Sequence, residues 1–253
     1  MGGILASLIL FLCYLFALLF LTGPKTTELW EEFLTQRILD SNKTVQEVVR
    51  FVKPRLPALQ VASNADDWKQ QSLDMRKAIL DRIVFRGDSS RWRNATCRVE
   101  WLETERGGSE YHLRKLRFEA LPGLWIPAIL YEPDNISGSV PVVLNFSGHE
   151  PLGKATTHAQ LRCINLAKRG MLALNVEWFG TGQLSQTSFV HRRMNQLDLC
   201  GSSGLAPFYL AMTRSLDLLL SHPNADSERV AVTGMSGGGW QTIMLSALDP
   251  RVT

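Results

Sequence analysis

The most constraining feature of this chain is the stretch at residues 230–253, which reads VAVTGMSGGGWQTIMLSALDPRVT. It holds a Gly-x-Ser-x-Gly pattern centred on Ser236, between an apolar run that predicts a buried strand and a run that predicts a helix. In such a pattern the serine occupies a sharp, strained turn, where the flanking positions must be small to clear both elements. We therefore expect Gly234 and Gly238 to form the turn and Ser236 to be exposed as a nucleophile. The alternative is a glycine-rich turn whose serine only caps the helix.

The pattern of apolar and polar residues before this stretch predicts a sheet. From about Thr96, two segments, CRVEWLE and YHLRKLRFEA, alternate apolar and polar residues as half-buried antiparallel strands do, and LWIPAILYEP predicts a third strand. Three continuous apolar runs then follow, VPVVLNF, MLALNVEW and ERVAVTG, each typical of a strand buried on both faces. Helical runs separate them, so we expect a mostly parallel sheet with helices on both faces. This order is typical of the α/β-hydrolase fold.

The N-terminus differs in character from the rest. No charged side chain occurs between Gly2 and Pro24, and an apolar run of about 20 residues is long enough to cross a bilayer. Residues 1–24 predict a signal peptide or a signal anchor, with membrane anchorage through residues 4–22 in the second case. Both alternatives imply an exported protein that is secreted, periplasmic or membrane-anchored. We further expect a helical N-terminal extension at residues 25–95 and the N-terminal portion of the α/β-hydrolase domain at residues 96–253.

Composition excludes several classes of function. The formal net charge is only +3 and no long basic run occurs, which argues against nucleic acid as a partner. There is no phosphate-binding glycine loop, and the spacings of the four cysteines match no zinc site. The sequence therefore predicts neither a nucleotide-binding loop nor a zinc site. Whether any of the cysteines pair is left open.

A second loop is a candidate for the oxyanion hole. Acyl transfer needs two N–H donors that face the developing oxyanion, and the residue after the nucleophile, Gly237, supplies one. The other is expected from the loop NFSGHE that follows VPVVLNF, where Gly148 lets the chain pass close to the nucleophile and His149 supplies the amide. The alternative is an ordinary turn with a surface histidine.

The substrate pocket is expected from residues at the same edge of the sheet. Trp178, in EWFGTGQ, and Trp240, just after the serine, are candidates to line it, and sugars often stack on tryptophan. Core packing is the alternative for Trp178. The long polar segment at residues 191–204 is a candidate for the acyl or leaving-group pocket.

These motifs resemble the acetyl xylan esterase-like α/β-hydrolases. The resemblance extends from about Trp68 to Thr253 and rests on VPVVLNFSGHE, NVEWFGTGQ, NQLDLCGSSGLAPFYLAM and VTGMSGGGWQT. It implies Ser236 as nucleophile, a catalytic acid and a histidine later in the chain, and neither a metal nor an organic cofactor. It also implies a carboxylic ester substrate, with deacetylation of a carbohydrate ester as the reaction.

The sequence departs from this pattern in its proton-handling residues. In this fold the triad runs Ser, then Asp or Glu, then His, yet all five histidines precede Ser236 and the one acid after it is Asp249. We therefore expect a fragment that lacks the triad acid and histidine, although His149 or His191 could act as the base. Two other functions stay open: a non-catalytic, membrane-anchored degenerate hydrolase or binding module, and a peptidase of the same fold.

Overall fold

The computed structural model describes residues 14, 26–58 and 60–253, and these divide into two units, Met1–Val61 and Ala62–Thr253. Apart from Tyr14, the residues for which a signal peptide or anchor is predicted lie outside the described part of the chain. Within the described part, no helix combines the length and the apolar character needed to cross a membrane. The domain boundaries expected after residues 24 and 95 stay predictions, and the division between the units falls after Val61.

In the described part of the first unit, the regular elements are helical. They are α2 (Thr26–Thr35), α3 (Lys43–Val52) and a short 3₁₀ turn, η1 (Lys53–Arg55), which contains Pro54. The apolar side chains of α3 are exposed, among them Val48 and Phe51. These helices follow the helical expectation for this part of the sequence.

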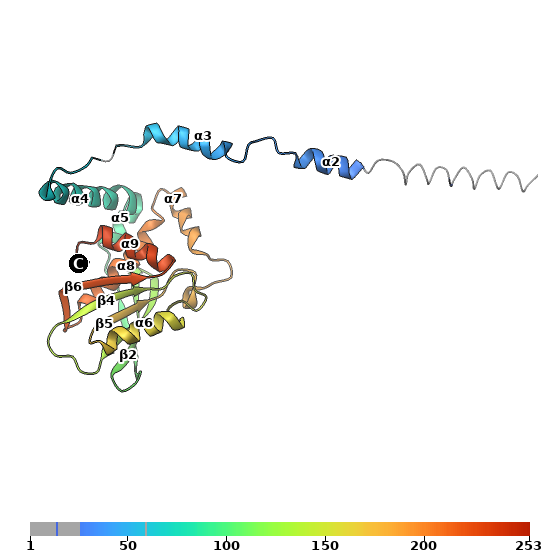
Figure 1. The fold of residues 1–253 in the computed structure, drawn as a ribbon. Coiled ribbons are helices and arrows are strands. Elements are labelled where there is room, and N and C mark those ends of the chain that lie inside the picture. The colour runs from blue at the N-terminus through green and yellow to red at the C-terminus, as the bar shows by residue number, and fades with distance from the viewer. Residues whose placement is uncertain (1–13, 15–25, 59) are drawn as a thin grey trace, which may run out of the picture. The chain divides into compact units, whose positions relative to one another are not determined.

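The second unit is built on a six-stranded sheet in the order β1-β2-β3-β5-β4-β6 (Figure 1). Strands β1 to β3 pair antiparallel, β3 pairs antiparallel with β5, and β5, β4 and β6 run parallel to one another. The predicted succession of antiparallel and then parallel strands is thus confirmed. The strands are β1 (Val99–Arg106), β2 (Tyr111–Leu121), β3 (Leu124–Pro133), β4 (Val140–Phe146), β5 (Leu172–Val176) and β6 (Ala225–Gly234).

Helices cover both faces of the sheet. Helix α6 (Thr157–Lys168) packs on one face, and α8 (Leu205–Leu220) and α9 (Gly237–Leu248) pack on the other. Because side chains alternate along a strand, β3 contributes Tyr131 to a small cluster with Cys163 of α6, and Leu130 to the larger core shared with α8 and α9. The sheet with helices on both faces agrees with the predicted α/β-hydrolase fold.

Strand β6 is less buried than its sequence predicts. Its apolar run predicted a strand buried on both faces, but only Val230 of β6 is buried, whereas five of the seven residues of β4 are. The physical reason is that β6 pairs with β4 on one side and lies at the edge of the sheet. On its other side, Thr253 and Val230 exchange backbone and side-chain hydrogen bonds.

Within the second unit, a helical segment precedes the sheet. It comprises α4 (Ala65–Ile79), the π-helical turn η2 (Leu80–Val84), the 3₁₀ turn η3 (Gly87–Ser89) and α5 (Ser90–Arg93). Asn64 caps α4 by accepting a hydrogen bond from the amide of Asp67. Arg76 donates to the carbonyl of Ala247, 3.0 Å away at the end of α9, so this segment is tied to the helix that follows Ser236.

Candidate active site

The backbone of Ser236 has an unusual conformation. Its φ of 55° and ψ of −117° make it the one non-glycine residue with positive φ among those that the structure describes. Such backbone costs about 1–3 kcal/mol and persists only where the surroundings enforce it. Ser236 also immediately precedes α9, so its side chain lies at the positive end of that helix. This is the strained strand-to-helix turn that the motif predicts.

The glycines around Ser236 hold the turn closed. A Cβ atom on Gly234 would overlap the backbone of Gly238, and a Cβ on Gly238 would overlap the carbonyl oxygen of Phe146 in β4. A larger residue at either position would therefore push the turn away from the sheet. The positions of Gly234 and Gly238 agree with the prediction that both form the turn.

The loop after β4 lies directly against this turn. A Cβ on Gly148 would lie 2.5 Å from the carbonyl oxygen of Met235 and 3.3 Å from the amide nitrogen of Gly237. Within the part of the chain that the structure describes, the amides of Gly237 and His149 donate no hydrogen bond. Both are thus available to a ligand, as an oxyanion hole requires, and that role stays a prediction.

The His149 side chain also lies within hydrogen-bond reach of Ser236. Its Nδ1 lies 3.2 Å from Ser236 Oγ, and its Nε2 lies 3.3 Å from Nε2 of His191. Burial, together with the positive charges of a protonated His149 and of Arg192, lowers the pKa of His191. The sequence indicated His149 for its amide and left its imidazole as a candidate base, and the structure places the imidazole beside Ser236.

A cavity of about 480 Å³ opens beside Ser236. Its walls are aromatic: Trp178 stacks on Phe208 with ring centroids 5.1 Å apart and meets Trp240 edge-on at 5.9 Å. Trp178 is only 3% exposed and therefore packs in the core. It also lines the cavity, so core packing and pocket lining, the two alternatives for this residue, both apply. The full lining comprises His149, Trp178, His191, Leu205, Phe208, Ser236, Gly237 and Trp240.

A buried ion pair fixes the two loops that bear His149 and Trp178. The Glu177 carboxylate, at the end of β5, contacts Lys154 Nζ at 2.8 Å and accepts hydrogen bonds from the amides of Lys154 and Gln183. Its side chain is fully buried and that of Lys154 is 8% exposed. Gly153 and Gly182 lie so close to this carboxylate that a Cβ on either would overlap it. The sequence indicated a tight loop around Glu177 but gave no sign of Lys154 as its partner.

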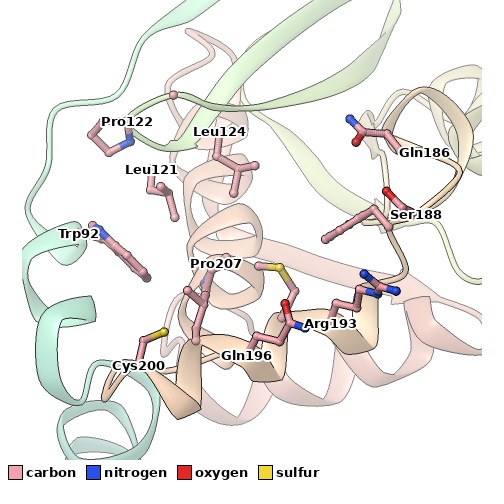
Figure 2. Close-up of a pocket in the computed structure, with 14 residues that line it drawn as sticks. Trp92, Leu121, Pro122, Leu124, Gln186, Ser188, Arg193, Gln196, Cys200 and Pro207 are labelled. Carbon is pink, nitrogen blue, oxygen red and sulfur yellow. The ribbon is translucent and has the colours of Figure 1, made fainter.

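A second, larger cavity of about 740 Å³ shares no lining residue with the first. Figure 2 shows Trp92 on one side of it and Arg193, Gln186 and Ser188 on the other, with Pro207 between. Its size does not make it the reactive site, because it contains no nucleophile with an adjacent base. We therefore assign the site to the smaller cavity at Ser236.

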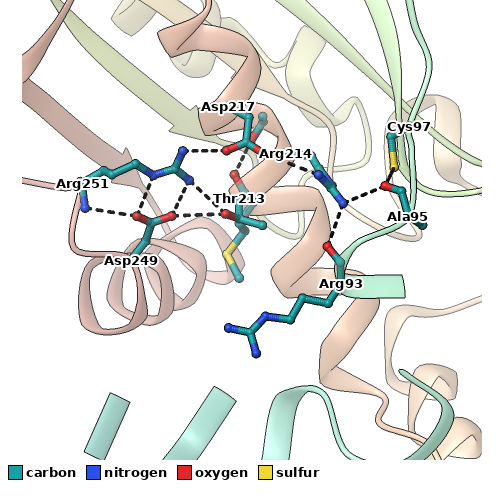
Figure 3. Close-up of polar contacts among 10 residues, drawn as sticks. Arg93, Ala95, Cys97, Thr213, Arg214, Asp217, Asp249 and Arg251 are labelled. Carbon is teal, nitrogen blue, oxygen red and sulfur yellow. Dashed lines mark hydrogen bonds and ion pairs between the residues drawn. The ribbon is translucent and has the colours of Figure 1, made fainter. Parts of the chain in front are cut away.

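Asp249 takes no part in the site. Its carboxylate is held by Arg251 through Nε and Nη2, at 2.9 and 2.7 Å, and by the Thr213 hydroxyl at 3.2 Å (Figure 3). Arg251 also bridges to Asp217 of α8. Asp249 thus anchors the end of α9 to α8.

Comparison with known proteins decides the family. The family model of the acetyl xylan esterases, AXE1, matches residues 91–253, which is more than half of the chain and includes Ser236 and the loops that face it. The chain belongs to the acetyl xylan esterase (AXE1) family. This confirms the resemblance noted in the sequence.

One curated protein is similar in sequence to part of this chain, and two solved structures share its fold. The acetyl esterase Axe7A of Xylanibacter ruminicola is 32% identical over 128 residues, which cover 46% of this chain and 28% of that protein. A Bacteroides fragilis structure assigned as an acetyl xylan esterase superposes with a TM-score of 0.66 at 21% identity, covering 85% of this chain and 59% of that one. Acetyl xylan esterase 1 from Thermoanaerobacterium gives 0.53 at 18% identity, covering 76% and 57%. The chain thus spans less than two thirds of the length of each relative.

The sequence did not predict two of the residues that line the cavity beside Ser236. Leu205 and Phe208 open α8, and their apolar character is equally typical of a helix face packed in the core. Only the position of α8 against Trp178 turns Phe208 toward the cavity. No local signal in the sequence could have distinguished the two uses.

Proposed function

We propose that this protein is a carboxylic ester hydrolase of the serine type that removes acetyl groups from a carbohydrate ester. The observation that carries the proposal is the conformation of Ser236, which is strained, exposed and in contact with an imidazole 3.2 Å away. A serine hydroxyl is a poor nucleophile until a neighbouring base takes its proton. Membership of the AXE1 family supports the acetyl ester as the reacting group.

The chemistry runs through an acyl-enzyme. Ser236 Oγ attacks the acetyl carbonyl carbon, and the negative charge that develops on the carbonyl oxygen is stabilised by the amides of Gly237 and His149. One such donor contributes about 10²–10³ in rate. Expulsion of the sugar hydroxyl leaves acetyl-Ser236, and water then attacks that ester to release acetate and the free serine.

The cavity suits a small acyl group attached to a sugar. Its walls carry aromatic rings from Trp178, Phe208 and Trp240 and no carboxylate. Trp240, which is 36% exposed, lies at the rim and can stack on a sugar ring as it enters. A neutral acetylated sugar therefore fits this site better than a charged substrate does.

The test is hydrolysis of acetylated xylo-oligosaccharides and p-nitrophenyl acetate by the chain and by Ser236→Ala. We expect the substitution to lower the rate by at least about 10³-fold, whereas Ser227→Ala, which alters an exposed serine in β6, should leave it unchanged. Cleavage of short peptide amides in preference to esters would support a peptidase instead. Equal rates for the chain and Ser236→Ala would rule out the proposed role of Ser236.

We also propose that the protein is exported, through residues 4–22 acting as a signal peptide or as an anchor. The support is the uncharged apolar character of the N-terminal sequence. N-terminal sequencing of the protein recovered from culture medium, periplasm and membranes tests both alternatives. A mature N-terminus near residue 24 in a released form indicates cleavage, and the intact N-terminus in the membrane fraction indicates anchorage. Recovery from the cytoplasm alone would contradict export.

A further inference from the structure

We propose that the larger cavity, the one of about 740 Å³, is a second carbohydrate subsite that holds sugar units of the substrate beyond the acetylated one. The inference rests on the proposed carbohydrate esterase function and extends it, because nothing in the chemistry at Ser236 requires a second cavity. The volume lies within the range of about 300–1,000 Å³ that is typical of pockets for small molecules. The cavity therefore has room for a short stretch of oligosaccharide.

The larger cavity is a close neighbour of the cavity at Ser236. The same two stretches of chain supply residues to both cavities. In the first stretch, Arg193 lines the larger cavity and His191 lines the cavity at Ser236, and in the second, Pro207 and Phe208 divide in the same way. The turn between β2 and β3, which also lines the larger cavity, lies at the edge of the sheet where β5 ends. A polymer whose acetylated unit lies at Ser236 can thus continue into the larger cavity.

The lining has the two components that a sugar requires. Trp92 supplies an aromatic ring, on which the apolar face of a sugar can stack, and it lies across the cavity from Gln186 and Ser188 (Figure 2). The polar side chains of the lining are Gln186, Ser188, Arg193 and Gln196, and none of the four forms a hydrogen bond or ion pair with any other described residue. Their amide, hydroxyl and guanidinium groups include both donors and acceptors, which hydroxyl groups of a sugar can use.

The charge of the cavity is consistent with a neutral sugar. Among the described residues that line it, Arg193 is the one with a charge. A guanidinium carries five N–H donors in a planar fork, which can donate to a pair of hydroxyl oxygens as well as to a carboxylate. The rest of the lining is mainly apolar, with Leu121, Leu124 and Leu197 among it. A sugar, with its apolar face and its rim of hydroxyl groups, matches both parts.

The walls of the larger cavity are held in place by hydrogen bonds outside it. Arg214 of α8 donates to the carbonyl of Arg93 at 3.0 Å, and this contact fixes the turn that carries Trp92 (Figure 3). The wall that precedes α8 is held by Asp198, which accepts a hydrogen bond from Arg86 at 2.5 Å. A site whose groups are already fixed loses less conformational entropy when a ligand binds.

The direct test is binding of unacetylated xylohexaose to the full chain carrying Ser236→Ala, measured by isothermal titration calorimetry. This probe needs no turnover, so the result does not depend on the proposed function. We expect the further substitution Trp92→Ala to weaken binding by about tenfold, through the loss of one stacking contact, and Trp92→Phe to keep most of the affinity. The matched control is Trp101→Ala, which removes an exposed tryptophan of β1 outside the cavity and should leave the affinity unchanged. Circular dichroism checks that each variant is folded.

Arg193 is tested by a pair of substitutions at an exposed position. Arg193→Met removes the donors and should weaken binding, whereas Arg193→Gln keeps a hydrogen-bonding group and should recover most of the affinity. Equal weakening by both substitutions, together with binding that falls steeply with salt, would indicate an anion site. That result would overturn the assignment of the cavity to a neutral sugar.

Turnover tests whether the subsite serves the reaction. With acetylated xylohexaose, Trp92→Ala should lower kcat/KM by about tenfold through a higher KM, whereas p-nitrophenyl acetate, which is too small to reach both cavities, should be hydrolysed at the unmodified rate. An equal fall with p-nitrophenyl acetate would show that Trp92 acts only through the fold.

The outcomes separate this inference from the proposed function. If xylohexaose does not bind, or if Trp92→Ala and Arg193→Met leave its affinity unchanged, the inference is overturned and Ser236 remains the proposed nucleophile. If binding depends on Trp92 but the chain hydrolyses neither ester, the subsite stands and the proposed function fails.

Discussion

The buried pair between Lys154 and Glu177 allows a quantitative prediction about the scaffold of the site. We consider Lys154→Met, which keeps much of the length and apolar stem of lysine but removes its charge. Glu177 then remains in a fully buried position without its counter-ion. Two of its contacts survive, because the amides of Lys154 and Gln183 still donate to the carboxylate.

The expected loss follows from that arrangement. Removing one partner of a buried ion pair typically costs 3–5 kcal/mol, chiefly because the other charge is left uncompensated. Because two amide donors still stabilise the carboxylate, we expect a loss at the lower end of this range, with the free energy of unfolding falling by about 3 kcal/mol. The double variant Lys154→Met/Glu177→Gln removes the charge as well, and should recover at least half of the loss.

The assay is urea unfolding followed by tryptophan fluorescence and circular dichroism, with coincidence of the two transitions as the test of two-state behaviour. Lys77→Met is the matched control, because its ion pair with Asp81 lies at the surface, where such pairs contribute about 0–1 kcal/mol. A loss below about 1 kcal/mol for Lys154→Met would refute the reasoning. So would a double variant that is less stable than Lys154→Met.

Two further predictions concern the turn at Ser236 and the response to acid. Gly148→Ala places a Cβ 2.5 Å from the Met235 carbonyl oxygen, so we expect slower fluorophosphonate labelling, whereas Gly108→Ala, whose nearest neighbour lies 3.4 Å away in the Tyr111 ring, should label normally. Unchanged labelling of Gly148→Ala would show that the two loops are not in tight contact. The Arg98 guanidinium and the Gly123 amide hold the pKa of Glu119 at about 2, below its usual 4.5. Because the folded pKa is depressed, this stabilisation is present above about pH 4.5 and is lost as pH falls toward 2. Urea unfolding of Arg98→Met should therefore show a weaker decline over that window, and an identical decline would contradict the assignment.

The fold was largely predictable because the sequence repeats one physical pattern. Apolar runs of five to seven residues between helical segments specify parallel strands, and β4 and β5 are buried as predicted. The same reasoning failed for β6, since an apolar run such as VAVTG does not reveal whether a second strand covers its outer side. Whether a strand is buried depends on which elements pack around it, and in β6 only Val230 is buried.

The candidate site was predictable only where backbone geometry decides it. Gly234, Ser236 and Gly238 could be placed from their own pattern, because the steric demands of the turn are local. The imidazole contact between His149 and Ser236 depends instead on Gly148 approaching Met235 from 87 residues earlier in the chain. Likewise, Phe208 belongs to the cavity only because α8 packs against Trp178.

The most direct test of the central claim, that Ser236 is the nucleophile, is mass spectrometry of the peptide that carries it. The full chain is treated with a fluorophosphonate, digested, and compared with Ser236→Ala treated in the same way. We predict one adduct, on Ser236, formed faster in native than in urea-unfolded protein and absent from Ser236→Ala. An adduct on another residue, or equal labelling of the native and unfolded chains, would contradict the claim.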